Sequence, residues 1–221
     1  RFPPVGDLPY MLTLTGYGFY WFLLAEEAAA PRWHDAPPEP LPEFITLVLR
    51  KGWQSIASGR EADALFRDVL PVFLPKQRWF GAKDSQITNV TLGNCSILRS
   101  RRGNYLLSEV DVSLSGSEEQ RYFLPLAYLG DEQALTPGSP LLPFTVAKGR
   151  QFRTVGPIYD AALDEKFPVA LLEGMREGLE LEASNGVLRF SGTEPLAGME
   201  IPEDLPVRRP GVEQSNSSII L

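Results

Sequence analysis

The run from Tyr105 to Leu114 constrains the fold of this 221-residue chain most strongly, because its apolar residues recur at every second position. One face would carry Leu106, Ser108, Val110, Val112 and Leu114, and the other Glu109, Asp111 and Ser113. This alternation is typical of an antiparallel strand with one buried face. Similar runs at 87–98 and 121–129 lie across two short turns, 99–104 and 115–118, and Pro125 would place the last run at an edge or a bulge. We therefore expect three consecutive antiparallel strands.

Further elements are expected on both sides of these strands. Residues 60–73 and 160–177 show helical spacing of apolar side chains, while 44–50 and 145–155 resemble strands. Gly81 is placed to end the first helical region with a positive φ. The sequence thus predicts an α+β fold, in which a curved, mostly antiparallel sheet is packed against a few helices. The acidic stretch 173–182 is interpreted as a solvated face.

Two regions precede this fold. Residues 1–25 carry aromatic runs separated by glycines, a pattern that indicates two strands of a sheet whose remainder lies upstream. Residues 26–43 contain five prolines and predict a semi-extended linker, in which His34 is interpreted as a solvated side chain. The last residues begin another apolar run, so we expect the chain to be cut from a longer protein.

Composition disfavours several classes of function. The formal net charge is −7, and no stripe of lysine or arginine is present to follow a phosphate backbone, which argues against nucleic acid as a partner. The longest apolar run, Phe19 to Ala25, is far below the length of about 20 residues that a membrane span needs. One cysteine, Cys95, and one histidine, His34, exclude an internal disulfide and paired-histidine metal motifs. We expect a cytoplasmic protein with no metal site in this chain.

The stretch from Gly211 to Ser218 has the clearest chemical content. Its small polar side chains, at Gln214, Ser215, Asn216, Ser217 and Ser218, precede an apolar run, and a turn of this kind can direct backbone N–H groups at an anion. Arg208 and Arg209 would add positive potential. A polar hairpin turn with no ligand explains the same residues. Neither GxxxxGK[ST] nor GxGxxG occurs in the chain.

A second candidate is the run from Gln77 to Lys83. Its cationic and aromatic residues could stack on a sugar or bind phosphate, and the motif positions are Gln77, Arg78, Trp79, Phe80, Gly81 and Lys83. The structural alternative is a helix end with a buried Trp79 and Phe80, and this is the interpretation that we favour.

Three stretches, in chain order, resemble parts of two enzymes. Residues 9–22 resemble the closing strands of the C-terminal β-domain of trehalose synthase. Residues 74–83 resemble the hallmark of the N-terminal cap of maltokinase, and 211–218 resemble the loop that opens the nucleotide-binding lobe of that kinase. The resemblance implies a fused trehalose synthase/maltokinase, with a cap domain over 44–183 and the start of the kinase N-terminal lobe over 184–221.

The resemblance also implies a function for the parent protein. A maltokinase transfers the γ-phosphoryl group of ATP to the anomeric hydroxyl of maltose, with Mg²⁺, and a trehalose synthase interconverts maltose and trehalose. Such kinases need a lysine, a catalytic Asp and metal-binding residues that would lie beyond Leu221. We therefore expect a cap that shapes the active cleft, with no activity and no bound ATP or Mg²⁺ in the chain alone, and whose partners are the rest of its own polypeptide. A non-catalytic module that binds carbohydrate or protein is the alternative.

Overall fold

The computed structural model describes residues 19, 42–116, 119–209 and 218–221. The chain divides into two compact units, Arg1–Leu41 and Pro42–Leu221, and the fold below is that of the second unit. The expected strands over residues 1–25 lie outside the described residues except for Phe19, and so does most of the expected linker over residues 26–43.

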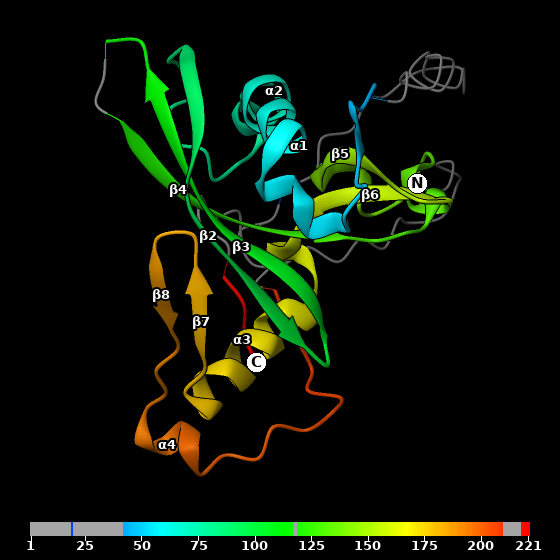
Figure 1. Cartoon of the computed structure of the whole chain (residues 1–221). Coiled ribbons are helices and arrows are strands. Elements are labelled where there is room, and N and C mark those ends of the chain that lie inside the picture. The colour runs from blue at the N-terminus through cyan, green and yellow to red at the C-terminus, as the bar shows by residue number, and fades with distance from the viewer. Residues whose placement is uncertain (1–18, 20–41, 117–118, 210–217) are drawn as a thin grey trace. The chain divides into compact units, whose positions relative to one another are not determined.

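The second unit is built on one sheet of eight strands in the order β1-β5-β6-β4-β3-β2-β7-β8 (Figure 1). Strand β1 pairs with β5 in parallel, and every other neighbouring pair is antiparallel. The mixed fold and its mostly antiparallel sheet confirm the expected α+β class. The strands are β1 (Thr46–Val48), β2 (Ile87–Ser100), β3 (Gly103–Leu114), β4 (Gln120–Tyr128), β5 (Thr145–Gln151), β6 (Thr154–Asp160), β7 (Glu180–Ala183) and β8 (Gly186–Arg189).

The centre of the sheet follows the sequence pattern, with two differences. All five residues of the expected apolar face of β3 are buried, but Tyr105 and Leu107 on the other face are buried too, so that this part of β3 is covered on both faces. Strand β4 lies between β3 and β6 and is not an edge strand, but Pro125 itself is paired only with Leu107 of β3, so its position is a local edge. Strand β4 pairs with β6 only from Leu126 onward, so Pro125 is the residue immediately before this pairing begins.

The region 145–160 is a hairpin rather than one strand followed by a helix. Strands β5 and β6 are joined by a tight turn at Phe152, which has a φ of 53° although it is not a glycine. Strand β6 continues through Gly156, where an added Cβ would lie 1.9 Å from the carbonyl oxygen of Leu129. The expected helix over 160–177 therefore starts later: a 3-10 turn, η7 (Ala161–Leu163), precedes α3 (Lys166–Glu177).

A helical segment over 53–76 covers one face of the sheet. It consists of η2 (Trp53–Ala57), α1 (Gly59–Ala64), a π-helical turn η3 (Leu65–Val69), α2 (Leu70–Phe73) and η4 (Leu74–Lys76). Pro71 has no N–H to donate to the carbonyl of residue 67, and the helix widens immediately before it. The segment ends at Gln77, which is extended, and Gly81 has no positive φ, so the expected glycine cap was wrong.

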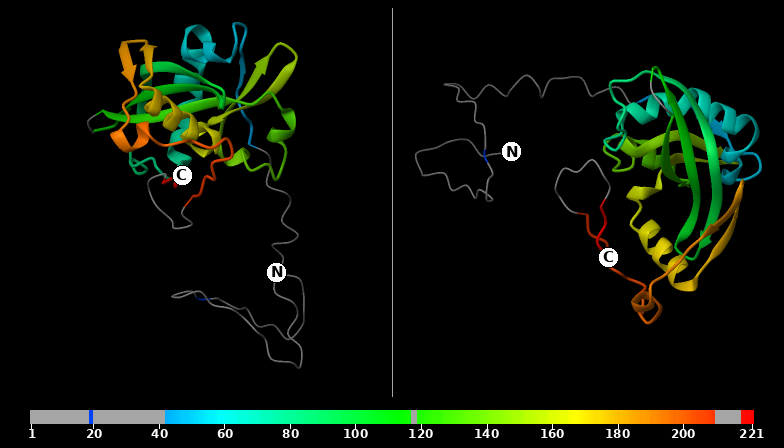
Figure 2. Two further views of the ribbon diagram at one scale, coloured as in Figure 1. Left: turned by 90° about the horizontal axis from the view of Figure 1, so that it is seen from below. Right: turned by 90° about the vertical axis from the view of Figure 1, so that its left-hand side faces the viewer.

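Two apolar clusters occupy the two faces of the sheet. The first joins the helical segment, through Leu65, Leu70 and Phe73, to Val110 and Val112 of β3. The second joins α3 to the opposite face of β3, with Tyr105 and Leu107 packed beside residues that include Phe167, Ala170 and Tyr159. Figure 2 shows α1 and α2 on one side of the curved sheet and α3 on the other.

The remaining elements are short. They are η5 (Glu132–Leu135), η6 (Leu142–Phe144) and α4 (Glu194–Ala197). The turn at Gly186 joins β7 and β8 in a hairpin, and β7 joins the sheet through the pairing of Ala183 with Ser96 of β2. The sheet thus continues across residue 183, where the sequence predicted a boundary. In the part of the chain that the structure describes, no helix is long and apolar enough to cross a membrane.

Candidate functional site

The predicted phosphate-binding positions Gln214, Ser215, Asn216 and Ser217 lie outside the described residues, whereas Ser218 is described and exposed. The structure describes both ends of this stretch. Arg208 and Ile220 exchange two backbone hydrogen bonds of 2.9 Å each, from each amide nitrogen to the other residue's carbonyl oxygen. This antiparallel pair, which we call the neck, brings the two ends of segment 209–219 together.

The neck is attached to the sheet unit by Arg209. Its guanidinium donates a hydrogen bond of 2.7 Å to the carbonyl oxygen of Ala162, in the 3-10 turn η7 that follows β6. The segment that contains the candidate loop is therefore held at its first residue by a charged side chain and at its base by two backbone hydrogen bonds.

Asp160 is hydrogen-bonded to Ala162, the same residue that accepts the hydrogen bond from Arg209. Asp160 is the last residue of β6, only 3% exposed, and its carboxylate caps η7 by accepting a hydrogen bond of 2.9 Å from the amide of Ala162. Burial raises the pKa of Asp160 above its ordinary value, although hydrogen bonds from Ala162 and Trp79 and the charge of Arg209 act in the opposite direction.

The side chains of the Gln77–Lys83 motif differ in burial, and its aromatic residues pack on strand β4. Phe80 is buried and Trp79 half-buried, and both rings pack on Tyr122, with centroid distances of 5.1 and 5.7 Å. Gln77 is buried and donates to the carbonyl oxygen of Phe73. Arg78, Gly81 and Lys83 are exposed. The aromatic part of the motif therefore packs against β4, and the Trp79 side chain opposes the rise of the pKa of Asp160.

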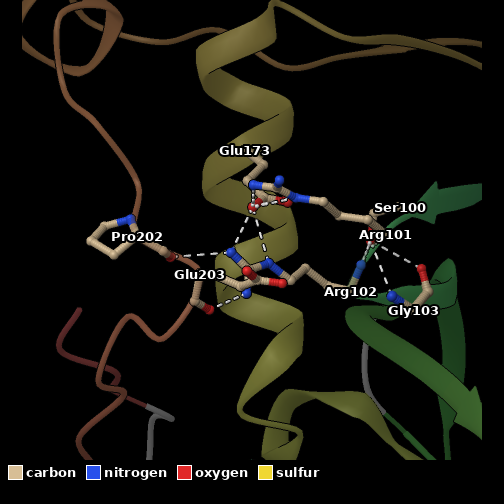
Figure 3. A network of polar contacts seen from close by, with 7 residues as sticks. All are labelled: Ser100, Arg101, Arg102, Gly103, Glu173, Pro202 and Glu203. Atoms are coloured by element: carbon tan, nitrogen blue, oxygen red, sulfur yellow. Dashed lines mark hydrogen bonds and ion pairs between the residues drawn. The ribbon is translucent and has the colours of Figure 1, made fainter.

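Sequence reasoning missed Glu173. The acidic stretch that contains it was interpreted as a solvated face, but Glu173 is 5% exposed on α3 and accepts hydrogen bonds from Arg101 and Arg102 of the β2–β3 turn (Figure 3). The basic turn between these strands was predicted correctly. Its pairing with Glu173 had no local signal, because the two sites are more than 70 residues apart in the chain.

The described residues offer no cluster of histidine, cysteine or carboxylate side chains that could hold a metal ion. They do contain a cavity of about 350 Å³ between the helical segment, residues 42–45 before β1, and residues 142–146 at the start of β5. Gln77 of the motif and its neighbour Lys76 contribute to its lining together with apolar side chains that include Phe44, Val69 and Phe73.

Comparison with known proteins gives two kinds of match. The family model of the maltokinase N-terminal cap domain matches residues 73–164. Near the N-terminus, short stretches match trehalose synthases. A trehalose synthase of Pimelobacter sp. is 68% identical over 25 residues, 11% of this chain and 4% of that protein. The trehalose synthase/amylase TreS of Mycolicibacterium smegmatis is 60% identical over 31 residues, and that of Mycobacterium tuberculosis 58% over 32 residues. Each of these two matches covers 14% of this chain and 5% of the relative.

The fold and the matched range thus define the class: residues 73–164 are similar to a maltokinase N-terminal cap domain, and this range includes the Gln77–Lys83 motif, the central strands and Asp160. The additional matches confirm the second resemblance, and their order is consistent with a fusion of a trehalose synthase and a maltokinase. The matched stretch spans only 4–5% of the length of the trehalose synthases.

Proposed function

We propose that this chain is the cap region of a maltokinase joined to a trehalose synthase, and that segment 209–219 forms part of the nucleotide site of that kinase. The parent protein would transfer the γ-phosphoryl group of ATP to the anomeric hydroxyl of maltose. The bond between the γ-phosphorus and the β,γ-bridging oxygen of ATP breaks, the sugar oxygen bonds to phosphorus, and the hydroxyl proton leaves. Such transfers depend mainly on positioning and charge neutralisation.

The neck is the observation that carries this proposal. A stretch rich in small polar residues binds phosphate only if its backbone N–H groups are held in one arrangement, because ordering a free loop would offset the binding energy. The Arg208–Ile220 pair joins the two ends of segment 209–219, and Arg209 attaches its start to the domain that matches the cap family. The sheet unit would act as the rigid support of the loop.

No residue of this chain is assigned a catalytic role. The catalytic base and the residues that bind Mg²⁺ would belong to other parts of the parent protein, and the cap would shape the mouth of the cleft and limit access of water. The 221-residue chain alone should therefore neither phosphorylate maltose nor bind Mg-ATP with micromolar affinity. Isothermal titration calorimetry measures this directly, and micromolar binding would contradict the proposal.

The decisive experiment uses the full-length protein and a coupled assay of ATP consumption with maltose, glucose and trehalose as acceptors. Maltose should be the preferred acceptor. The double variant Ser215→Ala/Asn216→Ala should raise the KM for ATP and leave the KM for maltose unchanged. Ser191→Ala, at an exposed position of the described chain, is the control and should change neither. Unchanged ATP kinetics in the double variant would remove the loop assignment.

A further inference from the structure

The β2–β3 turn reaches across to α3 and to the segment that leads to the neck. At its tip, Arg101 and Arg102 both donate to the same oxygen of Glu173, Oε1 (Figure 3). The distances to this oxygen are 2.7 Å from Nη2 of Arg101 and 3.0 Å from Nε of Arg102. One carboxylate thus holds two guanidinium groups together.

The two arginines differ in what else they bind. Arg102 also donates to the backbone carbonyl oxygens of Pro202, at 3.2 Å, and of Glu203. The side chain of Arg102 is 12% exposed, against 64% for Arg101. Arg102 therefore links α3 to the chain that runs toward Arg208, whereas the Arg101 side chain, among the described residues, donates to Glu173 alone.

The chain from Met199 to Arg208 depends on such contacts. Residues 200–207 belong to no helix or strand, and their regular feature is a single turn at Glu203 and Asp204. Ile201 is buried and anchors the start of this stretch. Carbonyl groups accept strong hydrogen bonds from a guanidinium, which presents several donors in a fixed plane. The guanidinium of Arg102 supplies such donors to Pro202 and Glu203, the two residues that follow Ile201.

Glu173 fixes the orientation of Arg102. Burial opposes ionisation of its carboxyl group, but hydrogen bonds from Arg101 and Arg102 and the charges of both side chains outweigh burial, so that the pKa of Glu173 is lowered. The group is an anion at neutral pH, and its position under the turn directs the remaining N–H groups of Arg102 toward Pro202 and Glu203.

We propose that Arg102 is a positioning residue for the nucleotide site: it holds residues 202 and 203 against the cap and thereby sets the position of the neck, through which it acts on ATP binding. This inference rests on the proposed function of segment 209–219. Arg101 shares the carboxylate of Glu173 but lacks the contacts with Pro202 and Glu203, and it therefore provides a matched control.

The test compares Arg102→Met with Arg101→Met in the full-length protein. Arg102→Met should raise the KM for ATP about tenfold, the effect of losing about one charge-assisted hydrogen bond, and should leave the KM for maltose within twofold. Arg101→Met should leave both constants within twofold. Arg102→Lys, which keeps the charge but cannot contact Glu173 and both carbonyl oxygens at once, should give an intermediate KM for ATP.

A second measurement separates positioning from simple loss of stability. Hydrogen exchange of the Arg208 and Ile220 amides in the 221-residue chain should accelerate in Arg102→Met and stay unchanged in Arg101→Met. An unchanged KM for ATP in Arg102→Met would overturn the inference, and so would an equal rise in both variants, because the effect would then pass through Glu173 alone. If the wild-type protein phosphorylates no sugar, the proposed function fails, and the exchange experiment still decides whether Arg102 holds the neck.

Discussion

The guanidinium of Arg209 donates a hydrogen bond of 2.7 Å to the carbonyl oxygen of Ala162, and the amide of the same Ala162 donates to the buried carboxylate of Asp160. One residue of the η7 turn therefore connects the start of segment 209–219 to the end of a core strand. The side chain of Trp79, in the Gln77–Lys83 motif, acts on the same carboxyl group by opposing the rise of its pKa.

Loss of the Arg209 side chain should loosen the neck. In Arg209→Met, the bond to Ala162 is absent, and exchange of the Ile220 amide should accelerate about tenfold, in line with the strength of a charge-assisted hydrogen bond. Arg208→Met is the matched control, since Arg208 pairs with Ile220 through backbone atoms only. Amide exchange followed by NMR gives both rates, and equal rates in the two variants would contradict the role of Arg209.

The Glu173 carboxylate should make stability depend on pH in the acid range. Its pKa is lowered from an ordinary value of 4.5, so its contribution is fully present above about pH 4.5 and is lost as the pH falls through the lower folded value. Glu173→Gln should reduce the free energy of unfolding by about 2 kcal/mol at pH 7, because two guanidinium groups lose a charged acceptor. Its stability should also fall less steeply on acidification.

Asp160→Asn provides a control, because Asp160 should make the free energy of unfolding depend on pH in the opposite direction to Glu173. Burial raises the pKa of Asp160 above 3.8, so the folded protein holds this proton more tightly than the unfolded chain does. Stability is therefore lost as the pH rises from about 3.8 through the folded pKa, and Asp160→Asn should lack this loss. Urea unfolding of the wild type and of both variants between pH 3 and pH 7 gives the difference in unfolding free energy between each variant and the wild type. If these two differences change with pH in the same direction, the assignment is refuted.

The Gln77–Lys83 motif should respond to substitution according to burial. Phe80 is 1% exposed and packs on Tyr122, so Phe80→Ala should lower the free energy of unfolding by about 3–5 kcal/mol. Lys83 is exposed, and Lys83→Ala should change it by less than about 0.5 kcal/mol. Chemical denaturation compares the two variants. A large effect of Lys83→Ala would instead indicate that the cationic end of the motif has a role beyond packing.

Gly156 should tolerate no side chain. Its added Cβ would lie 1.9 Å from the carbonyl oxygen of Leu129 and 2.6 Å from the amide of Asp131, both backbone atoms that cannot move aside cheaply. Gly156→Ala should therefore cost about 3 kcal/mol or more. Gly198→Ala, where nothing lies within 4 Å and φ is −89°, should stay within about 0.5 kcal/mol of the wild type. Thermal unfolding distinguishes these outcomes.

The elements that were predicted correctly are those whose signal is local. The alternation in β3 and the helical spacing of Leu65, Phe66, Val69, Leu70 and Phe73 are properties of short windows, and both are found in the structure. Strand β6 was missed because Gly156 and Pro157 weaken the strand pattern, although the Leu129 carbonyl leaves no room for a larger residue at 156. Its position is set by tertiary contacts, which no window of sequence contains.

The same distinction applies to the candidate site. The small polar residues before Leu221 and the aromatic motif are visible in the sequence, whereas the roles of Asp160, Glu173 and Arg102 are not. In the sequence, nothing distinguishes Glu173 from its solvated neighbours or Arg102 from Arg101. In the fold, α3 lies beside the β2–β3 turn, so that Glu173 accepts from Arg102, and Arg102 also donates to Pro202. Charges of this kind acquire their partners only through the fold.

The parallel pairing of β1 with β5 also affects the order of assembly. Thr46 is aligned with Lys148, so the first strand of the sheet to be synthesised has its neighbour about a hundred residues later in the chain. On the ribosome, β1 must wait for several seconds until β5 has emerged, since chains grow by about 5–20 residues per second during synthesis. The helical segment that follows β1 is therefore synthesised while the edge of the sheet is still missing.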